Sequence, residues 1–196
     1  MRWRALIALG LVLAGSALVA TTAAAESGSR DPVVKLIVRD CSKDDDLDVR
    51  YPVAALRRAL DELPRHVRRN TRCERVIERA IERAERRLDR EVFRIWSDCG
   101  RDDELDRDYS VRALRRALRQ LPDDLRMYTD CEDAIEDALE RAQRRLQREV
   151  DRILRDCDRD RDLDRDYSLE ALFRALNRVG HDKHCVRAIV RAIQHS

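Results

Sequence analysis

The sequence predicts an all-α protein, on three observations. Among its 196 residues only 4% are aromatic, five are Gly and four are Pro, which argues against collagen, a β-sandwich or a polytopic membrane protein. Asp, Glu, Lys and Arg make up 41% of the chain, yet hydrophobic residues still make up 43%, so apolar side chains can gather on one face of each helix. The third observation is an internal repeat whose copies share a helical spacing of apolar residues.

The N-terminus has the three parts of a secretory signal. A basic start (residues 1–4) precedes an apolar run (residues 5–20) and a small-residue stretch that ends at Ala25, after which we expect cleavage. The apolar run is shorter than the roughly 20 residues that span a bilayer, so an uncleaved anchor is the weaker alternative. The sequence therefore predicts a signal peptide over 1–25, a short flexible segment over 26–32, and a protein that is secreted or held in the cell envelope without stable membrane insertion.

The charge of the mature chain is balanced. Of the 41 basic residues, cleavage removes Arg2 and Arg4, which leaves 39 against 39 acidic residues along the same segments. A nucleic-acid partner requires an unbalanced basic surface, so none is expected. Because nearly all of the positive charge is Arg, which pairs with carboxylates in bidentate geometry, we expect a solvated surface with many ion pairs.

The sequence repeats itself at an offset of 58 residues. At this offset, residues 33–90 match residues 91–148 at 32 of 58 positions, and a third copy is truncated at residue 196. The cysteines fall into two columns, Cys41, Cys99 and Cys157 in one and Cys73, Cys131 and, after a four-residue deletion, Cys185 in the other. We therefore divide the mature chain into repeats over 33–90, 91–148 and 149–196.

Each copy has the same order of predicted elements. A helical stretch is followed by an acidic loop and then a short helix, whose two leucines at i, i+4 spacing lie on one face. Pro in a first turn and Ser as an N-cap both suit the starts of the short helices. The helical stretches are residues 33–40, 92–98 and 150–156, and the short helices begin near Pro52, Ser110 and Ser168 and end at residues 63–64, 121–122 and 179–180.

A long helix is predicted to join each copy to the next. Thr71 with Glu74 forms the T-x-x-E pattern of a capping box, which the second copy repeats, and apolar residues then recur at helical steps as far as Cys99 and Cys157. Coiled-coil association is an alternative, but the apolar spacing loses its heptad register after Leu88, so packing on the short helices is favoured. We expect three modules joined by rigid shared helices in an elongated particle.

Six cysteines in an exported chain predict disulfides, for which fifteen pairings are possible. Cys73 and Cys99 lie at opposite ends of one predicted helix, about 39 Å apart, whereas a disulfide needs Cα atoms about 6 Å apart. The economical pairing is Cys41 with Cys73, Cys99 with Cys131, and Cys157 with Cys185, each bond contributing roughly 3 to 4 kcal/mol. Zinc is the competing explanation, but the chain has no C-x-x-C, and only His181 and His184 lie beside a Cys.

The acidic loop is the best candidate for chemistry. Counted from Asp40, Asp98 or Asp156 as position 1, each copy has Asp at positions 5 and 9 and Leu at position 8, as in an EF-hand or dockerin calcium loop. The third copy adds position 3, so the candidate calcium ligands are Asp156, Asp158, Asp160 and Asp164. Against calcium, position 6 is not Gly and position 12 is Tyr instead of a carboxylate. The alternative is that these acids cap the short helix while the Tyr ring packs.

A longer pattern in the chain is similar to a known repeat. The pattern D-C-x-x-D-x-x-L-D-x-x-Y-[SP]-x-x-A-L-x-x-A-L-x-x-L-P, followed by T-x-C-E, resembles a repeat of uncharacterised secreted proteins of actinobacteria and covers residues 33–196. In that repeat a Gly often follows the second Asp, where this chain has Asp45, Asp103 and Arg161, which weakens the calcium interpretation. The resemblance implies secretion and brings no activity, cofactor or partner with it.

No pattern in the chain predicts catalysis. The four His never fall near a Ser in a motif such as G-x-S-x-G, Gly-rich phosphate loops are absent, and carboxylates are too abundant to indicate a glycosidase. The sequence therefore favours a non-catalytic structural or protein-interaction module, without a cofactor, whose partner is an unidentified protein or envelope component. The alternative hypothesis is a calcium-binding secreted module that uses the acidic loops.

Overall fold

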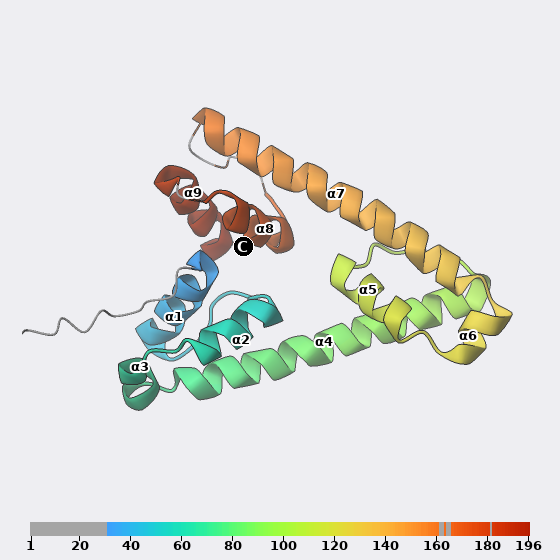
Figure 1. Ribbon diagram of the computed structural model, residues 1–196, viewed down its shortest axis with the longest axis horizontal. Coiled ribbons are helices and arrows are strands. Elements are labelled where there is room, and N and C mark those ends of the chain that lie inside the picture. The colour runs from blue at the N-terminus through green and yellow to red at the C-terminus, as the bar shows by residue number, and fades with distance from the viewer. Residues whose placement is uncertain (1–30, 161–162, 164–165, 181) are drawn as a thin grey trace, which may run out of the picture.

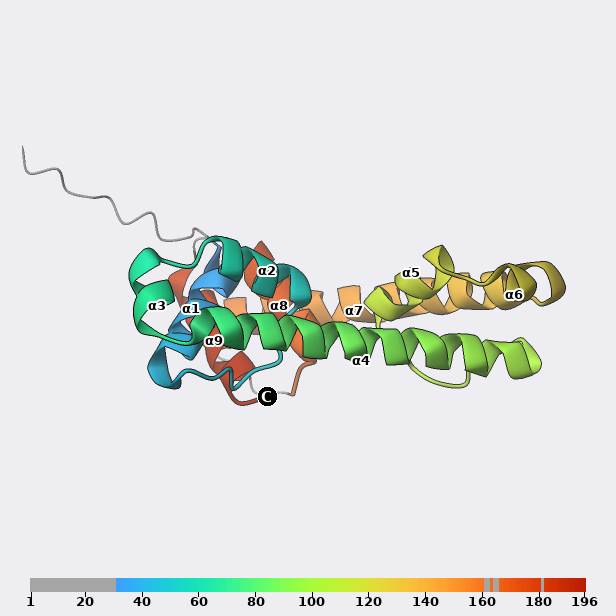
Figure 2. The same ribbon diagram turned by 90° about the horizontal axis from the view of Figure 1, so that it is seen from below.

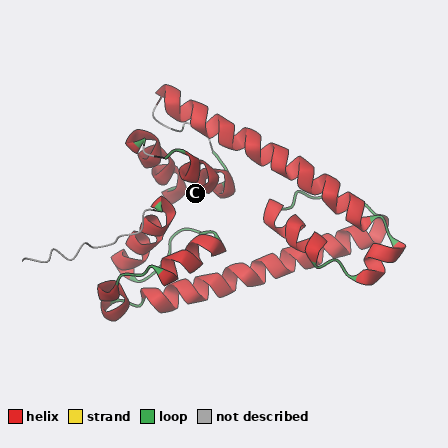
Figure 3. Cartoon of the chain, viewed as in Figure 1, coloured by secondary structure: helices red, strands yellow, loops and turns green. Residues whose placement is uncertain are grey.

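The structure is a computed structural model that describes residues 31–160, 163, 166–180 and 182–196. This part of the chain folds into nine helices joined by short loops and contains no strand (Figure 3). The predicted signal peptide, 1–25, lies outside the described residues, as does most of the segment 26–32. The prediction of an all-α fold is confirmed.

The helices recur at the offset of the sequence repeat. The bounds of α5, α6 and α7 are those of α2, α3 and α4 shifted by 58 residues, so the two complete copies form the same three helices. In chain order the helices are α1 (Pro32–Asp44), α2 (Val53–Asp61), α3 (Arg65–Asn70), α4 (Cys73–Asp102), α5 (Val111–Arg119), α6 (Asp123–Tyr128), α7 (Cys131–Asp160), α8 (Leu169–Arg178) and α9 (Lys183–Gln194).

Two long helices form the frame of the molecule. Helices α4 and α7 each run for 30 residues without a break, which is a length of about 45 Å at 1.5 Å per residue. Their buried side chains recur at helical steps and include Val76, Ile77, Leu88, Val92 and Ile95 in α4 and Ile135, Ala142, Leu146, Val150 and Ile153 in α7. No helix in the described part of the chain combines the length and the apolarity that crossing a bilayer requires.

The helices are arranged as a flat triangle. Helices α4 and α7 form two of its sides and meet at one corner, where α5 packs against both of them (Figure 1). A second corner is made by α1, α2, α3 and the start of α4, and the third by the end of α7 with α8 and α9. The view turned by 90° shows α4 and α7 running along the same length of the molecule, one behind the other (Figure 2).

The third side of the triangle is a contact between the second and third corners. Helix α1 packs against α8, and the rings of Tyr51 and Phe173 lie 5.8 Å apart between their centroids. The three modules therefore do not follow one another in a line, although the long shared helices that were expected to join them are present (Figure 1). The physical reason is that α5 packs on both long helices at once, so α4 and α7 leave the same corner side by side instead of continuing in line.

The starts of the short helices agree with the sequence pattern. Ser110 and Ser168 are N-caps whose hydroxyl oxygens accept from the backbone N–H groups of Ala113 and Ala171, at 3.2 and 3.3 Å. Two further helices, α3 and α6, were not predicted. Each has six residues and follows a proline at its N-cap, which is too short for the spacing of apolar residues to reveal it.

The predicted capping boxes do not form. Helix α4 begins at Cys73, and the Thr71 hydroxyl accepts from the Cys73 backbone N–H at 3.2 Å while it donates to the Val67 carbonyl at 2.7 Å. Glu74 pairs with Arg68 at 3.3 Å instead of reaching back to the backbone of Thr71. Thr71 therefore links the end of α3 to the start of α4, and the unexpected helix α3 is the reason that the box is not needed.

Candidate functional site: the disulfide-closed corners

Each corner of the triangle is closed by one disulfide. The Cα atoms are 5.6 Å apart in Cys41–Cys73 and in Cys99–Cys131, and 5.4 Å apart in Cys157–Cys185. These are the three pairs expected from the spacing along the chain. All six side chains are buried, and each bond ties the last turns of one helix to the first turn of a later helix.

A left-handed aspartate reinforces two of these corners. Asp45 and Asp103 end α1 and α4 with φ of 60° and 59°, and their backbone N–H groups donate to the carbonyls of Cys41 and Cys99. Their carboxylates accept from the backbone N–H of the residue before the second Cys, at 2.7 Å from Arg72 and 3.1 Å from Asp130. Asp is one of the few residues that tolerates this conformation, so it fills the place of the expected Gly and adds a second link across the corner.

A tyrosine joins each acidic loop to the helix before it. The Tyr51 hydroxyl donates to Asp40 at 2.8 Å and the Tyr109 hydroxyl to Asp98 at 2.9 Å, and Tyr167 donates to Asp156 in the third copy. The three rings are buried, as the packing alternative predicts. These pairs join positions 1 and 12 of the predicted calcium loop to each other.

Burial keeps these tyrosines protonated. Desolvation, followed by the hydrogen bond to Asp98, raises the pKa of Tyr109 to about 12, and the same two causes with Asp40 raise the pKa of Tyr51. The pKa of Asp40 is also raised, because desolvation outweighs the stabilising bond from Tyr51. At neutral pH both hydroxyls are therefore donors, and the pairs act as internal hydrogen bonds that fix the loop.

An acid from the preceding helix caps the short helix. Glu91, on α4, accepts from the backbone N–H of Ser110 at 2.8 Å, and Glu149, on α7, accepts from the Ser168 hydroxyl at 2.9 Å. We expected the acids of the loop to provide this capping, as the alternative to calcium binding. Capping acids exist, but they come from about two turns before position 1, where the helix brings them over the start of the short helix.

The predicted calcium ligands lie in different surroundings. Asp156 accepts from Tyr167, and Asp158 is exposed on the last turns of α7. The side chain of Asp160 and the whole of Asp164 lie outside the described residues. The expected helix end at residue 156 is wrong, because α7 continues to Asp160, as α1 and α4 continue to the same position of their copies. Calcium binding stays a prediction.

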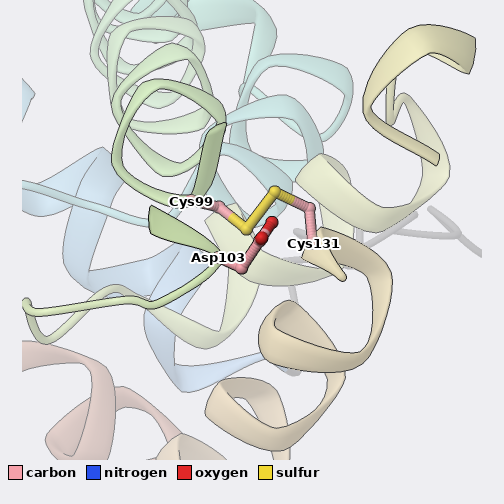
Figure 4. A group of neighbouring side chains, drawn as sticks. All are labelled: Cys99, Asp103 and Cys131. Carbon is pink, nitrogen blue, oxygen red and sulfur yellow. A yellow bond between two sulfur atoms is a disulfide. The ribbon is translucent and has the colours of Figure 1, made fainter. Parts of the chain in front are cut away.

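One group of possible metal ligands does come together among the described residues. The ligand atoms of Cys99, Asp103 and Cys131 lie within 4.8 Å of one another, with the Asp103 carboxylate beside the disulfide (Figure 4). The two sulfurs are bonded to each other, and a metal binds the thiolate. This group therefore holds the corner together and cannot act as a metal site while the disulfide is intact.

The fold and the corners define a class of protein: an all-α chain of disulfide-closed helical corners on two long helices. No protein family, no curated protein and no solved structure matches the chain. Sequence reasoning missed the left-handed aspartates, although the Gly of the similar repeat, at the same position, was the signal that could have found them.

Proposed function

We propose that the chain is exported and acts outside the cytoplasm as a non-catalytic structural or protein-interaction module. The observation that carries the proposal is the triangle itself, which three disulfides close at its corners and a helix contact closes along its third side. Disulfides persist in oxidising compartments, so a frame that depends on three of them suits a secreted or envelope protein.

The chemistry of the recurring polar groups supports a structural role. The aspartates, tyrosines and capping acids that recur at the corners bond to one another and to the backbone. Among the described residues, every buried side-chain nitrogen or oxygen has a hydrogen-bond partner. Recurring acids and phenols that are used in this way stabilise a shape, and a catalytic site would instead leave such groups available to a substrate.

The corner where α4 and α7 meet offers a place to test for a partner. Tyr128, at the end of α6, is 82% exposed, and the neighbouring Met127 is 66% exposed. Replacing Tyr128 by a photo-crosslinking residue changes a side chain with little internal contact, so the fold is retained. An exposed aromatic and a methionine are residue types that protein interfaces favour.

The experiment has two parts. First, the full chain is fused to an alkaline phosphatase reporter that is active only after export, and a fusion that lacks residues 1–25 is the control. Second, intact cells that carry the crosslinker at residue 128 are illuminated. We expect reporter activity that depends on residues 1–25, and one discrete adduct with an extracytoplasmic component that is lost in a Cys99→Ser, Cys131→Ser variant. An inactive reporter, or the absence of any discrete adduct, contradicts the proposal.

A further inference from the structure

Six arginines lie close together, four on α4 and one on each of two loops that approach this helix. Arg83, Arg87, Arg90 and Arg94 are spaced four, three and four residues apart, so they lie on one face of α4. Arg50 approaches this face from the loop before α2, and Arg107 approaches it from the loop before α5. We call these six residues the arginine cluster. All six side chains are exposed, and an open hollow of about 390 Å³ lies beside Arg87, Arg90, Arg94 and Arg107.

The acids near the cluster are engaged elsewhere. Along the same stretch of α4, Glu82 pairs with Arg86, Glu85 with Arg57, and Asp89 with Arg116 at 2.6 Å. The two acids that line the hollow, Glu91 and Asp108, bond to the Ser110 backbone and to Arg145. The helix thus separates its charges: its acids pair with Arg86 on the same helix or with groups on neighbouring elements, and within the described part of the chain no ion pair is present for any of the six arginines of the cluster.

Like charge is concentrated at Arg87. Desolvation lowers the pKa of Arg87, and the nearby Arg50, Arg83 and Arg90 lower it further. The guanidinium remains charged at neutral pH, because the ordinary pKa of arginine is above 12. Repulsion of this kind is relieved when a multivalent anion binds, so the cluster is arranged to gain more from an anion than isolated arginines would.

The second copy of the repeat lacks this arrangement. Helix α7 carries arginines at the four equivalent places, Arg141, Arg145, Arg148 and Arg152. There Asp108 pairs with Arg145 at 2.6 Å, whereas the first copy has Arg50 at the place of Asp108, facing Arg87 at the place of Arg145. One reversal of charge therefore turns a paired arginine into a crowded one, so that among the described residues one of the four arginines on the α7 face has an ion pair and none of the four on the α4 face has one.

We propose that the arginine cluster binds a compact oligophosphate, that is, an anion with two or more linked phosphate groups. Arginine donates bidentate hydrogen bonds to phosphate oxygens, and four arginines around one hollow supply more donors than a single phosphate can use. Arg87 and Arg94 are separated by about 10 Å along the helix, so phosphates that are linked in one ligand can reach both. A hollow of about 390 Å³ is within the range of small-molecule sites.

A short nucleic acid is the main competing ligand. Its binding would require basic surface that continues over many nucleotides, whereas the cluster is confined to one face of α4 and the mature chain is balanced in charge. This site goes beyond the structural role proposed above and does not depend on it, because an anion could bind the α4 face of any exported or cytoplasmic form of the folded chain.

The test is calorimetric titration of the oxidised protein with inorganic tripolyphosphate at low ionic strength. Orthophosphate and sulfate at matched ionic strength are the reference anions, and a nucleoside diphosphate tests phosphates that are carried on an organic group. We expect saturable one-to-one binding of tripolyphosphate. Binding of the nucleoside diphosphate as well would assign the site to phosphate esters, and its failure to bind would assign the site to free inorganic chains; both results support the proposal.

Matched variants connect the binding to the cluster. Arg90→Gln removes one charged contact and is expected to weaken binding about tenfold, while Arg148→Gln, the same change at the equivalent place on α7, leaves it unchanged. Arg50→Asp, which copies the second repeat, pairs Arg87 and is expected to weaken binding at least as much. Thermal melts establish that each variant is folded.

Three results would overturn the proposal. The first is equal, weak heats for tripolyphosphate and sulfate. The second is equal weakening by Arg90→Gln and Arg148→Gln, which would indicate a general charge effect. The third is tighter binding of a single-stranded oligonucleotide than of tripolyphosphate, with an affinity that rises with strand length, which would assign the surface to nucleic acid instead.

Discussion

The hydrogen bond between Tyr109 and Asp98 offers a quantitative test of how the corners are stabilised. Asp98 is only 5% exposed and accepts from the Tyr109 hydroxyl at 2.9 Å, while the nearest cation, Arg101, is 3.8 Å away. Replacing Tyr109 by Phe leaves a buried carboxylate without its donor. Because a hydrogen bond to a charged group contributes about 1.5 to 3 kcal/mol, we expect the free energy of unfolding to fall by about 2 to 3 kcal/mol.

The equivalent pair in the first copy is the matched control. Asp40 is partly exposed, so water can replace the Tyr51 hydroxyl, and Tyr51→Phe is expected to lower the free energy of unfolding by about 1 kcal/mol. For a chain of this size 1 kcal/mol corresponds to about 2 to 4 °C, so the melting temperatures of the two variants should differ by about 3 to 6 °C.

The assay is urea unfolding followed by circular dichroism at 222 nm, with the disulfides intact. Adding Asp98→Asn to Tyr109→Phe removes the buried charge, so the double variant should lose less than the sum of the two single losses. Strict additivity of the two changes, or a Tyr109→Phe loss no larger than that of Tyr51→Phe, would refute the reasoning from burial.

Three further predictions concern backbone conformation, the disulfides and pH. At φ 59° a residue with a Cβ and no polar side chain is strained, so Asp103→Ala should lower the free energy of unfolding by about 1 kcal/mol and Asp103→Gly by less than about 0.5 kcal/mol; equal losses in urea titrations would contradict this. The Cys99→Ser, Cys131→Ser variant opens a loop with a sequence separation of 32 and should lose about 3 to 4 kcal/mol in the same titration, a result that a loss under about 1 kcal/mol would exclude. Desolvation raises the pKa of Glu170, although the nearby Arg174 opposes the shift. Folding therefore favours the protonated acid. The stability that protonated Glu170 contributes is present below the ordinary pKa of about 4.5 and is lost as the pH rises through the pKa of Glu170 in the folded state. The Glu170→Gln variant should therefore have a higher melting temperature than the wild type at neutral pH, and this difference should shrink as the pH falls toward about 4.5. Calorimetry across that range would show the opposite trend if Glu170 were stabilised as an anion.

The long helices and the sulfur pairs could be predicted from the sequence because both depend on distance along the chain. The stretch from Cys73 to Cys99 has no Gly or Pro and has apolar side chains at helical steps, so it specifies one straight element, and the two cysteines at its ends are too far apart to bond to each other. Helices α3 and α6 could not be predicted in this way, because six residues contain fewer than two turns and thus no period to detect.

The closure of the triangle is a long-range property, yet one residue signals it. Phe173 is 4% exposed and meets the ring of Tyr51, and the two earlier copies have Arg57 and Arg115 at the same place. An aromatic residue in place of a surface arginine indicates that the third short helix packs on something that the others do not. The identity of the surface that it covers could not be read from the spacing, because it belongs to the start of the chain.

The arginine cluster escaped detection for a different reason. Counting charges along the chain shows balance, because acids and arginines alternate on α4. A helix sorts neighbours in sequence onto different faces, so alternation along the chain becomes separation in space. The reversal between Arg50 and Asp108 was visible in the comparison of the two copies, and only the packing of each loop against its helix shows what it does.

The contact between α1 and α8 also sets how such a chain can evolve in length. Open solenoids grow by duplication, since each added unit stacks on a free end. Here an extra 58-residue unit inserted between the second and third copies would separate Phe173 from Tyr51 and expose to water the apolar surfaces that now bury each other. A duplication of this kind would thus lose the contact between α1 and α8, so the closed triangle favours three copies of the unit.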